Sequence, residues 1–273
     1  MIICCGEALI DMIPTTLDSK ETAFIPKIGG AILNTSICLG RLGANVGFLG
    51  AVSKDLFGEM IFEELNNSKV NTSFCIETSN NTTLAFAKIA NGTTTYSFFD
   101  ENSSNRTICL KDVVLDDSVV DTIYVGGISL MSEPNGTEIE NFIAKESSKK
   151  IVFYDPNVRP NFIEDRSLFI QRFEKILSQS DIIKISEEDL EWLYPNGSFE
   201  EIYKQWLNLS LSIIVLTKGS EGAIIKTKNY EVTSRGEKVE VVDTIGAGDI
   251  FNGALFTLFP YTTLFRSDRK SVV

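Results

Sequence analysis

Residues 243–249 read D-T-I-G-A-G-D, and the apolar-periodic stretch 250–256 follows directly. Two glycines flanking an alanine let consecutive backbone N–H groups approach an anion closely, and a helix beginning here directs its free N–H groups and positive dipole end to the same point. The carboxylate of Asp249 suits a group that accepts the proton of a hydroxyl attacking a phosphoryl group. The segment therefore predicts a phosphate cradle with a base at its edge, although an aspartate capping a glycine-rich turn uses the same letters.

A second segment lies far upstream, where residues 29–34 read G-G-A-I-L-N and residues 39–44 read L-G-R-L-G-A. In this order the two segments resemble the N-terminal and C-terminal signatures of the ribokinase-like (PfkB) carbohydrate kinases. Two ordered motifs that span most of the chain are far more specific than either motif alone. The resemblance implies phosphorylation of a sugar hydroxyl by ATP, with Mg²⁺ as the metal.

Composition agrees with one globular domain and argues against several partners. The 273 residues are 43% hydrophobic and 23% charged, enough for one sizeable core. The formal net charge of −12 argues against nucleic acid or an anionic membrane as the main partner, because both require a basic surface. The start lacks the basic region of a signal peptide, and no apolar run is long enough to span a bilayer. We therefore expect a cytoplasmic protein that binds small molecules.

The sequence contains no histidine. Ser-His-Asp and Cys-His constellations are therefore impossible, and proton transfer falls to Asp, Glu, Lys, Tyr or Cys. The chain also lacks G-x-x-x-x-G-K-[ST] and a G-x-G-x-x-G following a strand, so P-loop and Rossmann interpretations lose their usual support.

Short apolar runs alternate with helical patterns along the chain. The predicted strands, which are short and β-branched, are 2–6, 46–51, 122–126, 151–155, 182–185 and 213–217. The predicted helices, with apolar residues three and four apart, are 32–42, 57–67, 138–147, 168–178, 187–193 and 199–207. This alternation predicts an α/β fold with a mainly parallel sheet and helices on both faces. Ligands of such folds collect at the carboxyl ends of the strands.

Two stretches break the alternation. Residues 85–89 and 94–99 predict a β-hairpin with an Asn-Gly turn, and residues 11–28 are strand-like without helical period. The family resemblance implies that segments at about 11–28 and 83–100 form a small β-sheet lid over the sugar, within one kinase domain of residues 1–256. It also implies a homodimer that forms through this lid.

The resemblance places a sugar site on residues of the N-terminal part. Asp11 ends the run G-E-A-L-I-D and occupies the place of the family aspartate that accepts hydrogen bonds from sugar hydroxyls. Gly29 and Gly30 permit close approach of the backbone to the substrate, and Asn34 offers a donor and an acceptor to a diol. Singly, these residues also fit a loop aspartate, turn glycines and a helix cap.

Residues 155–162 read D-P-N-V-R-P-N-F and resemble the D-x-N-x-R segment of fructokinases and 2-keto-3-deoxygluconate kinases. The guanidinium of Arg159 suits sugar oxygens, a keto-acid carboxylate or a transferring phosphoryl oxygen, although a salt bridge at a strand end explains it equally simply. Phe98 in the predicted hairpin is the candidate to close over the sugar, and packing is its alternative role.

The nucleotide side is predicted first from residues 184–189, which read K-I-S-E-E-D. They align with the family's N-x-x-E element, which organises magnesium and phosphate through water. Lys184 and Ser186 are the candidate nucleotide contacts. Asp189 and Glu187 are the candidate metal-organising carboxylates. A serine cap followed by an acidic first helical turn accounts for the same letters.

Two further loops complete the predicted nucleotide side. The turn T-K-G-S-E-G supplies Thr217, Gly219 and Gly222, which also suit a plain β-turn. Thr244 is expected to position the cradle beside the nucleotide. Asp243 belongs to a loop that in the family binds a monovalent cation, for which K⁺ is the candidate here.

The mechanism implied by the resemblance is direct phosphoryl transfer from magnesium ATP to a sugar hydroxyl. Asp249 accepts the hydroxyl proton, and the backbone N–H groups of Gly246, Ala247 and Gly248 stabilise charge on the phosphoryl oxygens. Fructose is the favoured substrate, because the D-P-N-x-R run and the G-E-x-x-x-D run resemble bacterial fructokinases. The alternatives are a 2-keto-3-deoxygluconate kinase, a ribose or nucleoside kinase, and a non-catalytic sugar- or nucleotide-binding pseudokinase.

Residues 257–273 differ in character from the rest. Residues 257–267 read T-L-F-P-Y-T-T-L-F-R-S and resemble a translated sequencing adaptor, so we exclude 257–273 from functional inference as non-native. The family continues for several elements after its signature, and the chain is therefore expected to be C-terminally truncated. We expect exposed apolar surface near residues 250–256, with reduced stability or activity.

Overall fold

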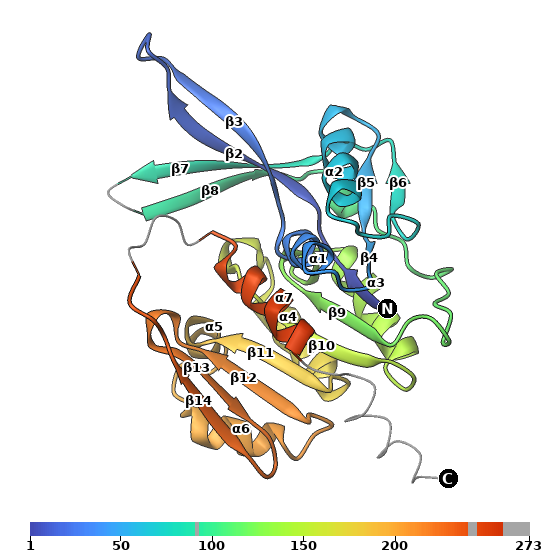
Figure 1. The fold of residues 1–273 in the computed structure, drawn as a ribbon, viewed down its shortest axis with the longest axis vertical. Coiled ribbons are helices and arrows are strands. Elements are labelled where there is room, and N and C mark those ends of the chain that lie inside the picture. Colours follow the sequence, from blue (N-terminus) through green and yellow to red (C-terminus); the bar gives the residue numbers. More distant parts are fainter. Residues whose placement is uncertain (91–92, 240–244, 259–273) are drawn as a thin grey trace.

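The computed structural model of the chain describes residues 1–90, 93–239 and 245–258, and within them an eight-stranded sheet forms the centre (Figure 1). In spatial order its strands are β14 (Glu231–Arg235), β13 (Gly222–Lys226), β12 (Ile213–Thr217), β11 (Ile182–Ser186), β10 (Ile151–Asp155), β9 (Thr122–Gly126), β1 (Ile2–Cys5) and β4 (Val46–Leu49). The strands from β12 to β4 are parallel, and β13 and β14 are antiparallel additions at one edge. The predicted α/β fold is confirmed.

Helices cover both faces of this sheet. They are α1 (Ala31–Arg41), α2 (Leu56–Asn67), α3 (Asn135–Glu146), α4 (Arg166–Ser178), α5 (Glu187–Leu193), α6 (Phe199–Trp206) and α7 (Ala247–Leu258). Successive residues of a strand point to opposite faces. Ile3 of β1 therefore belongs to the apolar cluster that includes residues of α3 to α6, whereas Cys4 belongs to the cluster that includes residues of α1, α2 and α7. Burial on both faces explains why the parallel strands read as continuous apolar runs.

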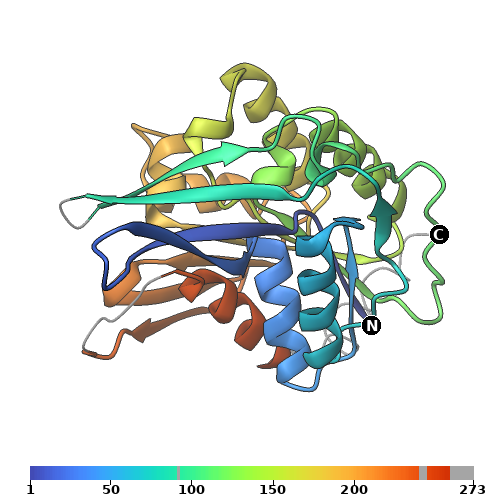
Figure 2. The same ribbon diagram turned by 90° about the horizontal axis from the view of Figure 1, so that it is seen from above.

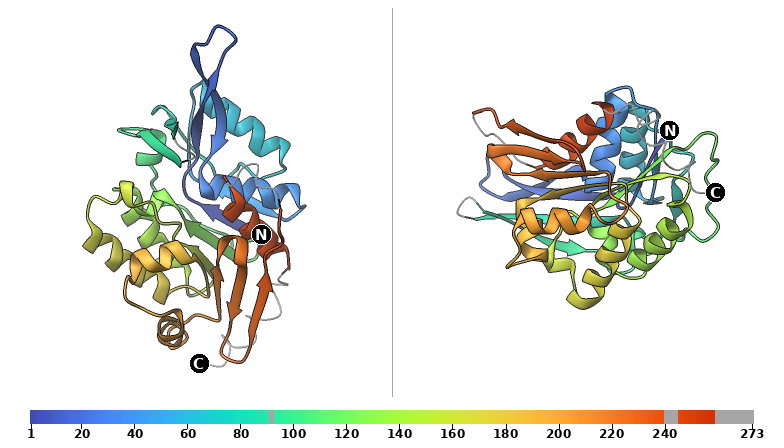
Figure 3. Two further views of the ribbon diagram at one scale, coloured as in Figure 1. Left: turned by 90° about the vertical axis from the view of Figure 1, so that its left-hand side faces the viewer. Right: turned by 90° about the horizontal axis from the view of Figure 1, so that it is seen from below.

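A separate four-stranded sheet, called the lid below, stands over one end of the main sheet (Figures 1 and 2). Its order is β3 (Thr22–Gly29), β2 (Leu9–Thr16), β7 (Thr83–Ala90) and β8 (Thr93–Phe99). The β2–β3 hairpin projects well away from the body of the molecule (Figure 3). The strand-like stretch 11–28 is thus an antiparallel hairpin. The predicted Asn-Gly turn at residues 91–92 lies outside the described residues.

One strand prediction is wrong in detail. Residues 46–51 were expected to form a single strand, but β4 ends at Leu49, and Ala51 begins β5 (Ala51–Ser53), which pairs with β6 (Ile76–Thr78) in a separate small sheet. The break falls at Gly50, where an ideal Cβ atom would lie 2.3 Å from the carbonyl oxygen of Gly6. The close backbone approach explains the glycine, and β5 then leaves the main sheet.

Helix α7 lies across the sheet and packs against α1. The two helices approach closely because Gly253 has no side chain: an ideal Cβ atom there would lie 2.5 Å from Cys38 Sγ. Phe256 is 1% exposed and packs against Tyr124 and Phe153, whereas Ile250 on the same helix is 61% exposed. The expected exposure of residues 250–256 is therefore right for Ile250 and wrong for Phe256. Residues 259–273 lie outside the described part of the chain.

No helix in the described part of the chain has both the length and the apolar character needed to cross a bilayer.

Candidate active site

A cavity of about 1490 Å³ opens between the lid and the carboxyl ends of the parallel strands. Its lining includes nearly all of the predicted site residues that the structure describes: Asp11, Gly30, Asn34, Phe98, Arg159, Lys184, Ser186, Glu187, Asp189, Thr217, Gly219, Gly222, Gly246, Ala247, Gly248 and Asp249. Gly29 is absent from this lining. Asp243 and Thr244 lie outside the described residues. Segments from both ends of the sequence thus meet around one cleft.

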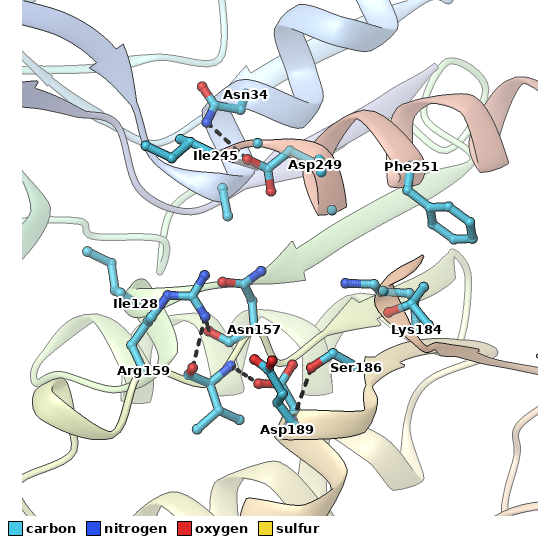
Figure 4. A pocket seen from close by; sticks show the side chains of 18 of the residues that line it. Asn34, Ile128, Asn157, Arg159, Lys184, Ser186, Asp189, Ile245, Asp249 and Phe251 are labelled. Atoms are coloured by element: carbon cyan, nitrogen blue, oxygen red, sulfur yellow. Dashed lines mark hydrogen bonds between the residues drawn. The ribbon is translucent and has the colours of Figure 1, made fainter. Parts of the chain in front are cut away.

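Asp249 lies in the first turn of α7 and is 7% exposed. Its Oδ2 atom accepts a hydrogen bond of 3.0 Å from Asn34 Nδ2, so α1 and α7 together fix the carboxylate at the cavity (Figure 4). Asn34 was predicted to bind the sugar. In the structure its amide nitrogen orients the carboxylate, which leaves its carbonyl oxygen and its second N–H for a ligand.

The pKa of Asp249 is raised to about 7. Burial is the main cause, and the nearby charges of Asp155 and Glu7 raise it further, whereas the bond from Asn34 and the charge of Lys184 lower it. A carboxylate with a pKa near neutrality is a stronger base than an exposed aspartate and is still ionised at about pH 8. The site thus holds a carboxylate whose environment suits proton abstraction.

The predicted cradle surrounds the start of α7. Gly246 has a φ of +75°, a left-handed conformation that favours glycine, and the helix begins at Ala247. The first N–H groups of a helix lack intrahelical partners and attract anions. Lys184 Nζ adds a positive charge close to this turn. An ideal Cβ atom on Gly248 would lie only 3.5 Å from it. An anion at this point therefore meets backbone donors and an ammonium group.

Gly29 and Gly30 allow close packing in the wall of the site. An ideal Cβ atom on Gly29 would lie 2.1 Å from Asp11 Oδ2, so this glycine makes room for the carboxylate rather than touching the cavity. Gly30 has a φ of +104° and precedes α1 directly. Burial raises the pKa of Asp11 to about 6. The two glycines thus position a half-buried carboxylate and the entry to α1.

Arg159 and Phe98 both line the cavity. Arg159 Nη1 donates to the carbonyl oxygen of Val158 at 2.9 Å (Figure 4), and its guanidinium lies within 4 Å of no carboxylate among the described residues. Phe98 of the lid packs edge-on against Phe162, with ring centroids 4.1 Å apart. The lid therefore touches the body of the protein at the rim of the cleft, and packing is an observed role of Phe98.

The segment 184–189 combines both of its predicted roles. Ser186 Oγ accepts a bond of 3.0 Å from the N–H group of Asp189, as a helix cap does. Asp189 Oδ1 accepts a bond of 3.0 Å from the N–H group of Val158, which fixes the loop that carries Arg159. Burial, followed by the charge of Asp155, raises the pKa of Asp189 to about 6. Glu187 is more exposed and pairs with Lys218 at 3.6 Å.

Three buried residues near the base escaped the sequence interpretation. Asp155 ends β10, Asn252 lies one turn after Asp249, and Glu7 follows β1; all three are at most 2% exposed. Asn252 carries a readable signal, since it is a polar residue within an apolar helical pattern. The other two stand in segments already noted for other residues.

A buried base, a helix N-terminus flanked by an ammonium group and a lidded cleft together define a phosphotransferase that acts on a small hydroxyl compound. Comparison with known proteins agrees with this class. The model described as pfkB family carbohydrate kinase matches residues 1–259. The chain belongs to the pfkB family of carbohydrate kinases.

The proteins similar to this chain include fructokinases. The chain is 41% identical over 255 residues to a fructokinase of Rhizobium leguminosarum bv. trifolii, covering 93% of this chain and 78% of the relative. It resembles the structure of a Xylella fastidiosa fructokinase with bound ATP, with a TM-score of 0.85, 24% identity and coverage of 95% and 82% of the two chains. A Vibrio cholerae O395 fructokinase with fructose, ADP and calcium gives a TM-score of 0.77 at 23% identity, covering 93% and 82%. The two structures establish likeness of fold.

Proposed function

We propose that the chain transfers the γ-phosphoryl group of ATP to fructose, giving fructose 6-phosphate and ADP. The observation that carries this proposal is the buried carboxylate of Asp249, which Asn34 orients at the N-terminus of α7 inside the cleft. The 41% identity to a bacterial fructokinase supports fructose as the acceptor. A pseudokinase has no use for a buried base at this point.

Each residue has a defined part in the proposed reaction. The 6-hydroxyl oxygen of fructose attacks the γ-phosphorus while Asp249 takes the hydroxyl proton. The bond between this phosphorus and the β,γ-bridging oxygen breaks, and ADP leaves with that oxygen. The N–H groups of residues 246–248 and the ammonium of Lys184 stabilise charge on the phosphoryl oxygens. Asp11 and the carbonyl oxygen of Asn34 accept hydrogen bonds from the other sugar hydroxyls.

The nucleotide is proposed to lie along the Ser186, Thr217, Gly219 and Gly222 side of the cavity. Among the described residues no group of three carboxylates or thiols is placed to hold a metal ion. This fits Mg²⁺, which binds mainly to substrate phosphates and water with one or two carboxylates, here Asp189 or Glu187. When bound, the ion neutralises charge on the phosphates. K⁺ beside Asp243 and a cytoplasmic location stay predictions.

The charge of the sugar end favours fructose over 2-keto-3-deoxygluconate. The cavity lining there includes Glu7, Asp11 and Asp249, with Arg159 as the opposing cation. A neutral sugar offers hydroxyl donors to these carboxylates, whereas the carboxylate of a keto-acid is repelled by them. Arg159 is the feature that favours the keto-acid, because its guanidinium recognises carboxylates well.

An ADP-release assay across four acceptors tests this proposal. With saturating magnesium ATP, kcat/KM for fructose should exceed that for ribose, adenosine and 2-keto-3-deoxygluconate by at least about tenfold, the size of one lost polar contact. A higher value for the keto-acid would transfer the proposal to that substrate. Normal ATP binding without turnover on any acceptor would favour the pseudokinase.

The two raised pKa values predict a biphasic acid limb. Asp249 must be ionised to accept a proton and Asp11 to accept sugar hydroxyl bonds, so activity is lost as the pH falls through each pKa. Below about pH 7, log(kcat/KM) for fructose should fall with a slope near one, and below about pH 6 the slope should approach two. Measurement from about pH 5 to 9 checks this. A flat profile down to about pH 5 would contradict it.

We also propose that a second copy of the chain covers the outer face of the lid. Phe24, Phe86 and Phe99 form an edge-to-face cluster there, with centroid distances of 5.0 and 5.3 Å, and Phe99 is 64% exposed. Exposed aromatic clusters are typical of interfaces. Sedimentation of the wild type and Phe99→Glu should give a dimer and a monomer, respectively. A monomeric wild type at micromolar concentration would rule the dimer out.

A further inference from the structure

Four buried polar side chains connect helix α7 to three neighbouring strands. Tyr124 belongs to β9, Asp155 to β10, Lys184 to β11 and Asn252 to α7, and none is more than 3% exposed. Asp155 Oδ2 accepts from Lys184 Nζ at 3.0 Å and from Asn252 Nδ2 at 2.7 Å. Asn252 Nδ2 also donates to Tyr124 Oη at 2.9 Å. One carboxylate oxygen therefore joins the helix of the catalytic base to the ammonium group.

Fold stability alone is a poor explanation of this network. A buried ion pair often contributes less to stability than apolar side chains of the same volume would. Within the described residues, Asp155 Oδ1 and Asn252 Oδ1 find no hydrogen-bond partner, and unsatisfied buried acceptors cost free energy. The network is well suited to a different task, which is to hold a cation at a fixed place.

The ammonium group of Lys184 is held beside the phosphate cradle at the start of α7. The ammonium of Lys184 lies next to Gly248, in the first turn of α7, and Lys184 lines the cavity (Figure 4). Asp155 occupies one of its three N–H donors, so the others are available to phosphate oxygens. Asn252 lies three residues after Asp249, almost one helical turn, so the two side chains share one face of α7. The hydrogen bonds of Asn252 therefore restrict rotation of α7 about its axis.

We propose that Asn252 and Asp155 are positioning residues for phosphoryl transfer. They hold the Lys184 ammonium and the first turn of α7 in fixed relative positions around the phosphates of ATP. This proposal rests on the kinase function proposed above. Asn252 contacts neither sugar nor nucleotide in this account. It orients the shared oxygen of Asp155 toward Lys184, and Asp155 in turn restricts the ammonium to the side facing Gly248.

The charges around the base agree with this arrangement. Asp249 faces Asn34 from α1, Glu7 from the end of β1, Asp155 from β10 and Lys184 from β11. Asp155 raises its pKa and Lys184 lowers it. Removing the negative charge of Asp155 should therefore lower the pKa of the base, an effect that loss of packing alone does not produce.

Asn252→Leu in the full chain is the first test, because it keeps the branched arrangement of side-chain heavy atoms and removes both donated bonds. Calorimetric affinity for ATP should weaken about tenfold and kcat should fall about tenfold or more, the effect of one charge-assisted hydrogen bond. Fructose affinity should stay within about threefold. Thr122→Val is the matched control: its buried hydroxyl also lacks a partner among the described residues, but it lies at the far end of β9. Its ATP affinity should equal that of the wild type.

Asp155→Asn is the second test, in case Asn252→Leu fails to fold. Its acid limb of kcat/KM should move to lower pH by about half a unit or more. ATP affinity unchanged in a folded Asn252→Leu, or an unmoved acid limb in Asp155→Asn, would overturn the proposal. ATP binding is measured without an acceptor sugar, so this outcome stays separate from a failure of fructose turnover.

Discussion

Asp249→Asn is expected to lower kcat for fructose phosphorylation by about 10³-fold, within the range that a positioned general base contributes. Asparagine has nearly the same shape and its carbonyl oxygen can still accept the 3.0 Å bond from Asn34. It cannot take the proton of the attacking hydroxyl. Fructose and ATP affinities should therefore stay within about threefold of the wild type, because the loss falls on the transition state.

The same substitution should stabilise the fold at about pH 8. The folded pKa of Asp249 is about 7, above its ordinary value of 3.8, so the native state binds this proton more tightly than the unfolded chain. Stability from this group is present at acid pH and falls as the pH rises from about 4 to about 7. Asparagine removes the cost of the buried charge, and thermal unfolding at about pH 8 should show a gain of at least about 1 kcal/mol.

Near-normal turnover of Asp249→Asn would refute the role of this carboxylate as the base.

Phe256→Ala is expected to lower the free energy of unfolding by about 3 to 5 kcal/mol. The ring is 1% exposed and packs against Phe153 at a centroid distance of 4.5 Å and against Tyr124 at 5.5 Å. Its loss leaves a cavity between α7 and the sheet. Because α7 carries Asp249, loosening of this helix should also reduce turnover. Denaturant unfolding followed by circular dichroism measures the stability directly.

Ile250→Ala on the same helix is the matched control. This side chain is 61% exposed, so the change should stay within about 0.5 kcal/mol. The pair compares one buried and one exposed apolar residue in a single element. If both variants lost the same free energy of unfolding, α7 would not pack on the sheet as described. If neither variant lost any, the helix would lie outside the cooperative core.

The strands and the central motifs were predictable from sequence because their signals are local. The run at Ile182–Ser186 carries isoleucine at three of its five positions, on both faces of the strand, since both faces of a parallel strand are buried. The left-handed turn at Gly246 needs glycine, and the motif shows one. The edge strand β14 gave no such signal, because all five of its residues are exposed.

The connections inside the site were beyond sequence reasoning for a physical reason. Asp155, Lys184 and Asn252 are separated by many residues, and only the order of strands in the sheet brings them to one carboxylate oxygen. Asn34 was assigned to the sugar, but its amide orients Asp249 on a helix 215 residues away in sequence. Asp189 was assigned to the metal, and one of its oxygens fixes the loop of Arg159 through Val158.

The most direct measurement identifies the product. Fructose labelled with ¹³C at C6 is incubated with magnesium ATP and the chain, and ¹³C and ³¹P NMR spectra follow the reaction. We expect one new phosphate monoester coupled to C6, formed in equal amount with ADP, and formation of the same signal about 10³-fold more slowly with Asp249→Asn. Phosphate appearing on another carbon, or ADP accumulating with free phosphate alone, would contradict it.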